Sequence, residues 1–267
     1  MSDQVETTSF QEKKQGDIFT ALYTFFHGLV LFKRSLYRYK QAMQMSYPFA
    51  LHGLCLAPVV LLLLGLSIFI GSEDAVFAYF TIARETNPSV TLCIELFSGG
   101  ALFVFYPLYA FFLFRGIRKK TPEDIFFTLS YCIAQILIAS LLCRMVKIAV
   151  GRPRPMTGGP FQPFSLGWGY QSFPSGHTGE IVGSVAPFVW RYGRLQPLLL
   201  PLCFGTVVAA VAFSRIYLGM HHPTDIMGGL VFGSLSGYVS WILCKVLLTQ
   251  WRELLPRRIR AWLDSAV

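Results

Sequence analysis

Charged residues are scarce in this chain of 267 residues, of which Asp, Glu, Lys and Arg together make up 14%. Soluble domains carry about 25% charged residues, so the composition argues against an ordinary soluble enzyme. The hydrophobic fraction is 54% and includes 24 phenylalanines. Because one soluble core of this length cannot hide so much apolar surface, the composition favours a chain surrounded mostly by lipid.

Acidic residues are the scarcer charge, with 14 Asp and Glu against 23 Lys and Arg and a net charge of +9. In a soluble protein this excess suggests nucleic-acid binding, whereas in a membrane protein it marks the cytoplasmic segments. The distribution of the basic residues along the chain decides between these interpretations.

Cysteine pairs of the CxxC type are absent, which argues against the common zinc and thiol-redox motifs. We expect the six cysteines to be small buried hydrophobic side chains, because each lies inside an apolar run. An internal repeat is also absent, and the first 14 residues, MSDQVETTSFQEKK, lack the basic start of a secretory signal, so no cleavage is expected.

Long apolar runs are abundant, and six of them approach the roughly 20 residues that cross the hydrocarbon core as a helix. The fourth is the shortest and begins with polar residues, and we include it on the assumption that Glu180 faces other helices. The sequence thus predicts an all-α bundle with six transmembrane helices: Pro48 to Gly71, Leu96 to Phe114, Ile125 to Cys143, Gly176 to Trp190, Leu195 to Ser214 and Ile226 to Cys244.

These runs divide the chain into an N-terminal segment (1–47), a six-span core (48–248) and a basic tail (249–267). Within the first segment, the apolar stretch from Ile18 to Phe32 is too short to cross and is followed by four basic residues interleaved with aromatic and aliphatic ones. This pattern predicts an interfacial amphipathic helix on an anionic membrane surface.

The basic residues predict the orientation of the bundle. All but six of the 23 lie on the side of the N-terminus, so we expect both termini in the cytoplasm and a multi-pass protein of the inner membrane. The charge excess then marks topology, and nucleic acid is not an expected partner. The six exceptions on the outer side are Arg84, Arg144, Lys147, Arg152, Arg154 and Arg215.

Three polar clusters fall on this outer side: KIAVGRPRP (147–155), FPSGHTGE (173–180) and SRIYLGMHHPTD (214–225). Lys147, Arg154 and Arg215 are three cations near one membrane surface, which an anion such as phosphate would neutralise. Backbone N–H groups around Ser175 and Gly176, at a helix start, would add further donors. The sequence therefore predicts a phosphate site.

Two histidines have distinct tasks available in this site. Asp225 follows His221 by four residues, so its carboxylate can hold one ring nitrogen as N–H and leave the other as a nucleophile. His177 is placed to give a proton to a leaving oxygen. The expected reaction is phosphoryl transfer to His221 followed by hydrolysis of the phosphohistidine.

The three clusters resemble the signature of the type 2 phosphatidic acid phosphatase superfamily: K-x6-RP at Lys147 to Pro155, PSGH at Pro174 to His177, and SR-x5-H-x3-D at Ser214 to Asp225. The six-span layout is similar to its membrane branch, the lipid phosphate phosphatases. The resemblance implies a metal-independent, cofactor-free phosphatase in which His221 is the nucleophile, His177 the acid and Asp225 the orienting group. It further implies phosphate binding by Lys147, Arg154, Ser175, Gly176, His177 and Arg215.

The expected substrate is a membrane lipid phosphate or diphosphate in the outer leaflet, reached from the periplasm or cell exterior. Candidates are undecaprenyl diphosphate, phosphatidylglycerophosphate, phosphatidic acid, diacylglycerol pyrophosphate and lipid A 1-phosphate. No obligate protein partner is expected. A lipid-to-lipid phosphotransferase is the first alternative and an anion transporter the second, although the repeats typical of transporters are not evident.

Several residues keep more than one interpretation. Glu180 would contact substrate, keep His177 protonated or bond a neighbouring helix, and His222 would contact substrate or shape the site. His221 and Asp225 would alternatively cap the last span. We further expect an ion pair between Glu95 and Arg144, and a close helix contact through Gly229, Gly233 and Gly237, within the bundle or in a dimer.

Overall fold

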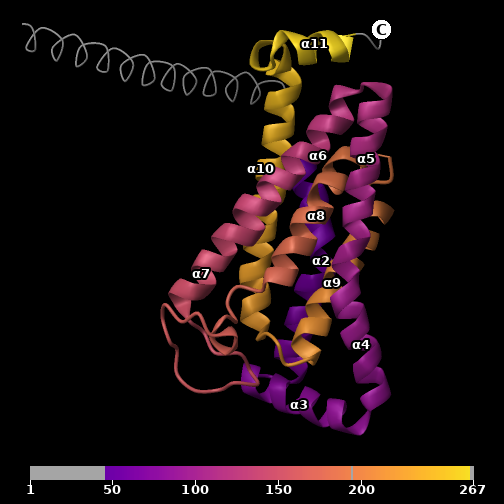
Figure 1. The fold of residues 1–267 in the computed structure, drawn as a ribbon. Coiled ribbons are helices and arrows are strands. Elements are labelled where there is room, and N and C mark those ends of the chain that lie inside the picture. The colour runs from indigo at the N-terminus through magenta and orange to yellow at the C-terminus, as the bar shows by residue number, and fades with distance from the viewer. Residues whose placement is uncertain (1–45, 194, 265–267) are drawn as a thin grey trace, which may run out of the picture. The chain divides into compact units, whose positions relative to one another are not determined.

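The computed structural model describes residues 46–193 and 195–264, which form helices joined by short turns and one long loop, without a strand in these ranges. The all-helical prediction is therefore confirmed for this part of the chain (Figure 1). The predicted amphipathic helix near the N-terminus lies outside the described residues. The α-helices are α2 (Ser46–Phe69), α3 (Glu73–Thr86), α4 (Pro88–Gly100), α5 (Phe105–Lys119), α6 (Pro122–Ala134), α7 (Cys143–Val150), α8 (Gly176–Tyr192), α9 (Leu199–Tyr217), α10 (Pro223–Leu254) and α11 (Arg257–Asp264).

Three shorter elements complete the described chain. The 3-10 turn η1 (Ala101–Val104) joins α4 to α5, and the π-helix η2 (Gln135–Leu142) joins α6 to α7, so each pair forms one long rod. A second 3-10 turn, η3 (Trp168–Tyr170), lies in the loop between α7 and α8.

Five helical stretches of the described residues are long and apolar enough to cross a membrane: Phe49–Phe69, Pro88–Lys119, Pro122–Val150, Leu199–Tyr217 and Pro223–Leu254. Each overlaps one of the six predicted spans. The remaining predicted span coincides with α8, which has only 17 residues and is not among the five. The count of six spans therefore stays a prediction.

Helix α8 forms the centre of the bundle, since Figure 1 shows it among the longer helices and most of its side chains are buried. Its closest neighbour is α10, and the glycines of α10 allow the approach. A Cβ at Gly229 would lie 2.6 Å from the Ser175 carbonyl oxygen, and a Cβ at Gly233 would lie 2.5 Å from that of Gly179. The small-residue face of α10 thus packs inside the bundle.

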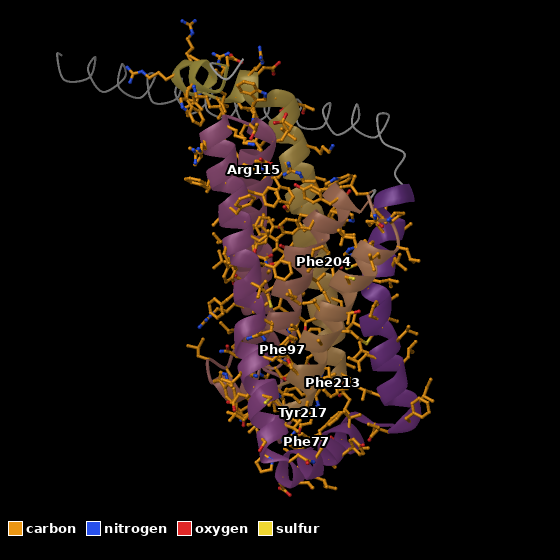
Figure 2. All side chains as sticks on the ribbon, turned by 90° about the vertical axis from the view of Figure 1, so that its right-hand side faces the viewer. Phe77, Phe97, Arg115, Phe204, Phe213 and Tyr217 are labelled. Carbon is orange, nitrogen blue, oxygen red and sulfur yellow. The ribbon has the colours of Figure 1, made fainter. Side chains whose placement is uncertain are left out.

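The residues in the short connections are of the types that commonly end and start helices. Glu73 and Asp74 occupy the first turn of α3, where the Ser72 hydroxyl accepts a hydrogen bond from the Ala75 N–H at 3.3 Å. At the other end of the bundle, α5 ends at Lys119, the next residue, Lys120, has a φ of +52°, and Pro122 starts α6. Figure 2 shows these two ends, with Arg115 near one and Phe77 and Tyr217 near the other.

Asp124 joins three helices at the Arg115 end. Arg115 donates two hydrogen bonds to this carboxylate, at 2.7 and 2.8 Å, and Arg191 donates a third at 2.6 Å. Since Asp124 is only 3% exposed, this pairing offsets the cost of burying its charge and fastens α5, α6 and α8 together.

Two expectations about single residues were wrong. Cys55 and Cys143 are buried, but Cys93, Cys132 and Cys203 are exposed on the helix surface, where an apolar thiol can face lipid instead of the core. Glu95 and Arg144 are both exposed, and no ion pair joins them in the described structure.

We expect Gly233→Ala to destabilise the protein, because the new methyl group would overlap the backbone of α8. Overpacking of this kind costs about 1–3 kcal/mol, which should lower the melting temperature in detergent by about 5 °C. Gly65→Ala is the matched control, since a Cβ there has no neighbour within 4 Å. Equal melting temperatures for the two variants would contradict the assigned α8–α10 contact.

Candidate active site

The three sequence clusters meet at the Tyr217 end of the bundle. The first spans the end of α7, the second spans the start of α8, and the third connects the end of α9 to the start of α10. Gly151 makes the turn out of α7 with a φ of +58°, and a Cβ there would lie 1.7 Å from the Gln162 carbonyl oxygen. Only glycine fits this turn, which directs the following loop back across the bundle.

Lys147 lies beside the start of α8. Its Nζ donates to the carbonyl oxygen of Gln171 at 3.0 Å, and a Cβ on Gly176 would lie 3.6 Å from its Cε. The absent side chain of Gly176 therefore leaves room next to the lysine, as expected for a residue that lets an anion approach the backbone.

Arg154 is 7% exposed and is held by the loop backbone. It donates to the carbonyl oxygens of Trp168 at 3.1 Å and Met220 at 3.0 Å, and its guanidinium lies 4.1 Å from the centre of the Trp168 ring. The Arg154 N–H also donates to the Gly169 carbonyl oxygen at 2.7 Å. These contacts fix the guanidinium before any anion binds.

Arg215 completes what we call the cation cluster, namely Lys147, Arg154 and Arg215. It lies in the last turn of α9, and its Nη1 donates to the Ser98 hydroxyl of α4 at 3.0 Å. Its Nε is buried and has no partner within the described residues. A buried N–H of this kind fits an anion-binding role, because an unpaired buried donor is otherwise costly.

Ser175 links the second cluster to the third. Its N–H donates to the Asp225 carbonyl oxygen at 2.9 Å, and its hydroxyl accepts from the Thr178 hydroxyl at 3.0 Å as the cap of α8. Accepting this bond leaves the Ser175 proton available to an anion. His177 follows in the first turn of α8, at the helix end that favours negative charge.

His221 is 2% exposed, and its Nδ1 lies 3.6 Å from Oδ2 of Asp225. This distance is slightly longer than a hydrogen bond, as is common for catalytic pairs without substrate. Burial, with smaller contributions from Lys147 and Arg154, lowers the pKa of His221 to about 3, against the opposing effect of Asp225. The ring is therefore neutral at physiological pH, with Nε2 on the side away from the carboxylate.

Asp225 is fully buried and has three further partners. The Ser172 hydroxyl donates to Oδ2 at 2.5 Å, the His222 N–H donates to Oδ2 at 2.8 Å, and Arg152 donates to Oδ1 at 2.8 Å. The bond from His222 is the capping contact considered above. Asp225 thus both caps α10 and faces His221.

The two residues with open interpretations lie at the edges of this site. The Tyr106 hydroxyl donates to Oε1 of Glu180, and Gln135 donates to the Glu180 carbonyl oxygen at 2.7 Å, so Glu180 does bond neighbouring helices. His222 precedes α10, with its Nδ1 3.9 Å from Glu73. Residues 46–193 and 195–264 hold no group of three His, Cys, Asp or Glu side chains arranged as metal ligands.

Sequence reasoning missed four contributors to this site. Ser98, Ser172 and Glu73 contact Arg215, Asp225 and Arg152 across large sequence separations, and Trp168 stacks on Arg154. The resemblance named none of them, and single Ser, Glu or Trp residues carry no spacing signal. Arg84, which had no assigned role, donates to the Tyr217 carbonyl oxygen and so caps the end of α9.

Residues 125–247 match the family model described as PAP2 superfamily. The chain is 29% identical over 109 residues to a lipid A 1-phosphatase of Rhizobium etli, covering 39% of this chain and 45% of that protein. It is also 29% identical over 152 residues to a lipid A 4'-phosphatase of Porphyromonas gingivalis, covering 53% and 61%. The chain thus spans about half the length of the curated relatives it matches. No solved structure is significantly similar to it.

We expect Arg215→Gln to weaken the binding of inorganic phosphate about tenfold or more, since a charge-assisted hydrogen bond contributes about 1.5–3 kcal/mol. Calorimetric titration of the detergent-purified protein would measure this loss. Arg118→Gln, an exposed position at the Arg115 end of the bundle, is the control and should bind phosphate like the unmodified protein. Equal affinity in both variants would remove Arg215 from the phosphate site.

Proposed function

Because residues 125–247 match the PAP2 superfamily model, we propose that this chain is an integral membrane lipid phosphatase. The single observation that carries the proposal is the His221–Asp225 pair beside the cation cluster, at one end of helices apolar enough to span a bilayer. Cations fixed next to a neutral buried imidazole suit phosphoryl transfer to nitrogen.

The substrate is a lipid with a terminal phosphate or diphosphate. Two relatives are named for phosphatases of lipid A, and the other candidates share the same chemistry, a phosphoryl group with an oxygen leaving group. A site at the end of the bundle lets the lipid keep its tails in the bilayer while the head group reaches the cation cluster.

In the first step, Nε2 of His221 attacks the phosphorus atom. A P–N bond forms while the P–O bond to the lipid breaks, and His177 donates a proton to the departing oxygen. Asp225 orients the ring through Nδ1 and stabilises the positive charge that develops on it. The cation cluster and the N–H groups at the start of α8 bind the phosphoryl oxygens, whose charge is spread in the transition state.

In the second step, water attacks the phosphohistidine. His177, now neutral, takes a proton from the water as the P–N bond breaks, and His221 keeps the electron pair of that bond. Inorganic phosphate leaves, and both histidines return to their starting states. Each step needs only protein side chains and water, so the reaction proceeds without a metal or cofactor.

The proposal includes a topology. The helix α8 is a sixth membrane span, shorter than the others and covered by them, both termini are cytoplasmic, and the site faces the outer leaflet of the inner membrane. Basic residues at the Arg115 end, on α5, α8, α10 and α11, support this orientation.

We expect the purified protein to release phosphate from at least one lipid among undecaprenyl diphosphate, phosphatidylglycerophosphate, phosphatidic acid and lipid A, in detergent with a chelator present. His221→Ala should lower the rate by about 10³-fold or more, because the nucleophile is lost. His222→Ala should cost far less, because His222 contacts Asp225 through its main-chain N–H, which the substitution keeps. Transfer to an acceptor lipid without free phosphate would indicate a phosphotransferase instead, and loss of activity on chelation would refute the metal-free mechanism.

For the topology, we expect a cysteine placed at Thr157, in the loop after α7, to react with a membrane-impermeant maleimide in intact spheroplasts. A cysteine at Lys119 should react only after permeabilisation, because it lies at the other end of the bundle. Both substitutions are made in a variant without the six native cysteines. The reverse labelling pattern would refute the outward-facing site.

A further inference from the structure

Glu73, the first residue of α3, uses one carboxylate oxygen to contact the start of α10 and the other to contact Arg152. Its Oε1 accepts hydrogen bonds from the Thr224 N–H at 3.0 Å and the Thr224 hydroxyl at 2.6 Å. Its Oε2 accepts from Nη2 of Arg152 at 2.6 Å. One side chain therefore ties α3 to the loop after α7 and to the first turn of α10.

Arg152 carries this contact onward to the buried carboxylate beside His221. Its Nη1 donates to Oδ1 of Asp225 at 2.8 Å and to the Thr224 hydroxyl at 2.5 Å. The Arg152 side chain is 15% exposed and that of Asp225 is 0% exposed, so water screens this pair weakly. Charges of alternating sign thus run from Glu73 through Arg152 to Asp225, whose carboxylate faces the neutral ring of His221.

The alternation of charge matters for the nucleophile. Without a second carboxylate nearby, the positive charge of Arg152 would partly cancel the negative charge of Asp225. The positive charge that develops on His221 during the reaction would then be stabilised less. The carboxylate of Glu73 offsets the charge of Arg152 from the opposite side. Glu73 also borders an apolar pocket of about 500 Å³ between α2 and α10, so part of its surroundings is apolar.

We propose that Glu73 is a positioning residue for the phosphoryl transfer: through Arg152 it fixes the Asp225 carboxylate and preserves its negative charge toward His221. This inference rests on the proposed phosphatase function. It concerns the nucleophile alone, because the described contacts of Glu73 do not include the cation cluster.

The state of Glu73 agrees with this role. Burial alone would raise the pKa of its carboxyl group, but the hydrogen bonds from Thr224 and the charge of Arg152 outweigh burial and lower the pKa below the usual value. Glu73 is therefore ionised at neutral pH and supplies the negative charge that the arrangement needs.

Steady-state kinetics of the full chain in detergent test the reaction. Glu73→Gln keeps the shape and removes the charge, and we expect kcat to fall about 10–100-fold with KM changed less than about threefold. Glu73→Asp should recover most of the loss. In an Arg152→Met background, Glu73→Gln should cost less than about twofold more, because both changes break the same connection.

Asp74→Asn is the matched control, because Asp74 shares the first turn of α3 and is exposed. It should leave kcat and KM unchanged. An equal loss in this control would assign the effect to α3 stability and overturn the proposal. Wild-type kcat in Glu73→Gln, or full additivity with Arg152→Met, would overturn it as well.

Ligand-binding measurements test the role of Glu73 independently of the proposed lipid substrate. Orthovanadate takes a fifth bond from a nucleophile and so mimics the transition state, whereas inorganic phosphate needs only the cation cluster. By calorimetry, Glu73→Gln should weaken orthovanadate binding about tenfold or more and phosphate binding less than about threefold. Equal weakening of both ligands, or of neither, would overturn the role of Glu73. If the unmodified protein binds both ligands but releases phosphate from no lipid, the proposed function fails, while these affinities still decide the role of Glu73.

Discussion

The close contact between α8 and α10 is the constraint on which the candidate site depends. Glycines on α10 let the two backbones approach, and the Ser175 N–H then reaches the carbonyl oxygen of Asp225. This single bond sets the start of α8, with its outward N–H groups, against the turn that carries His221. Without this bond, the second and third sequence clusters would lie at the same end of the bundle but would not be held in contact with each other. Packing between small residues here serves chemistry as well as stability.

Backbone carbonyl groups in the loop between α7 and α8 hold two of the three cations. Carbonyl oxygens of Trp168 and Gln171 hold Arg154 and Lys147, together with that of Met220. Three cations in one place repel each other, and carbonyl dipoles offset that cost without adding negative charge that would compete with phosphate.

Much of the arrangement followed from the sequence because its signals are local. Apolar runs predicted six spans, and five of them overlap helical stretches long and apolar enough to cross a membrane. The spacing within the three clusters predicted the approach of Asp225 to His221. The contacts of Glu73, Ser98 and Ser172 could not be predicted, since they join helices far apart in the chain and each depends on a single polar residue. The cysteine prediction failed for a related reason: apolarity identifies residues that avoid water, and in a membrane protein that surface includes the lipid side.

The short length of α8 affects how deep the candidate site lies below the membrane surface. A helix of 17 residues is about 25 Å long, whereas the hydrocarbon core is about 30 Å thick. If its far end is level with the ends of α5 and α6 that Asp124 fastens to it, the end that begins at Gly176 stops short of the opposite surface. A phosphate group bound there would sit below the plane of the surrounding head groups. The lipid of the proposed reaction would then have to be lowered or drawn sideways into the protein to bring its phosphate to the cation cluster.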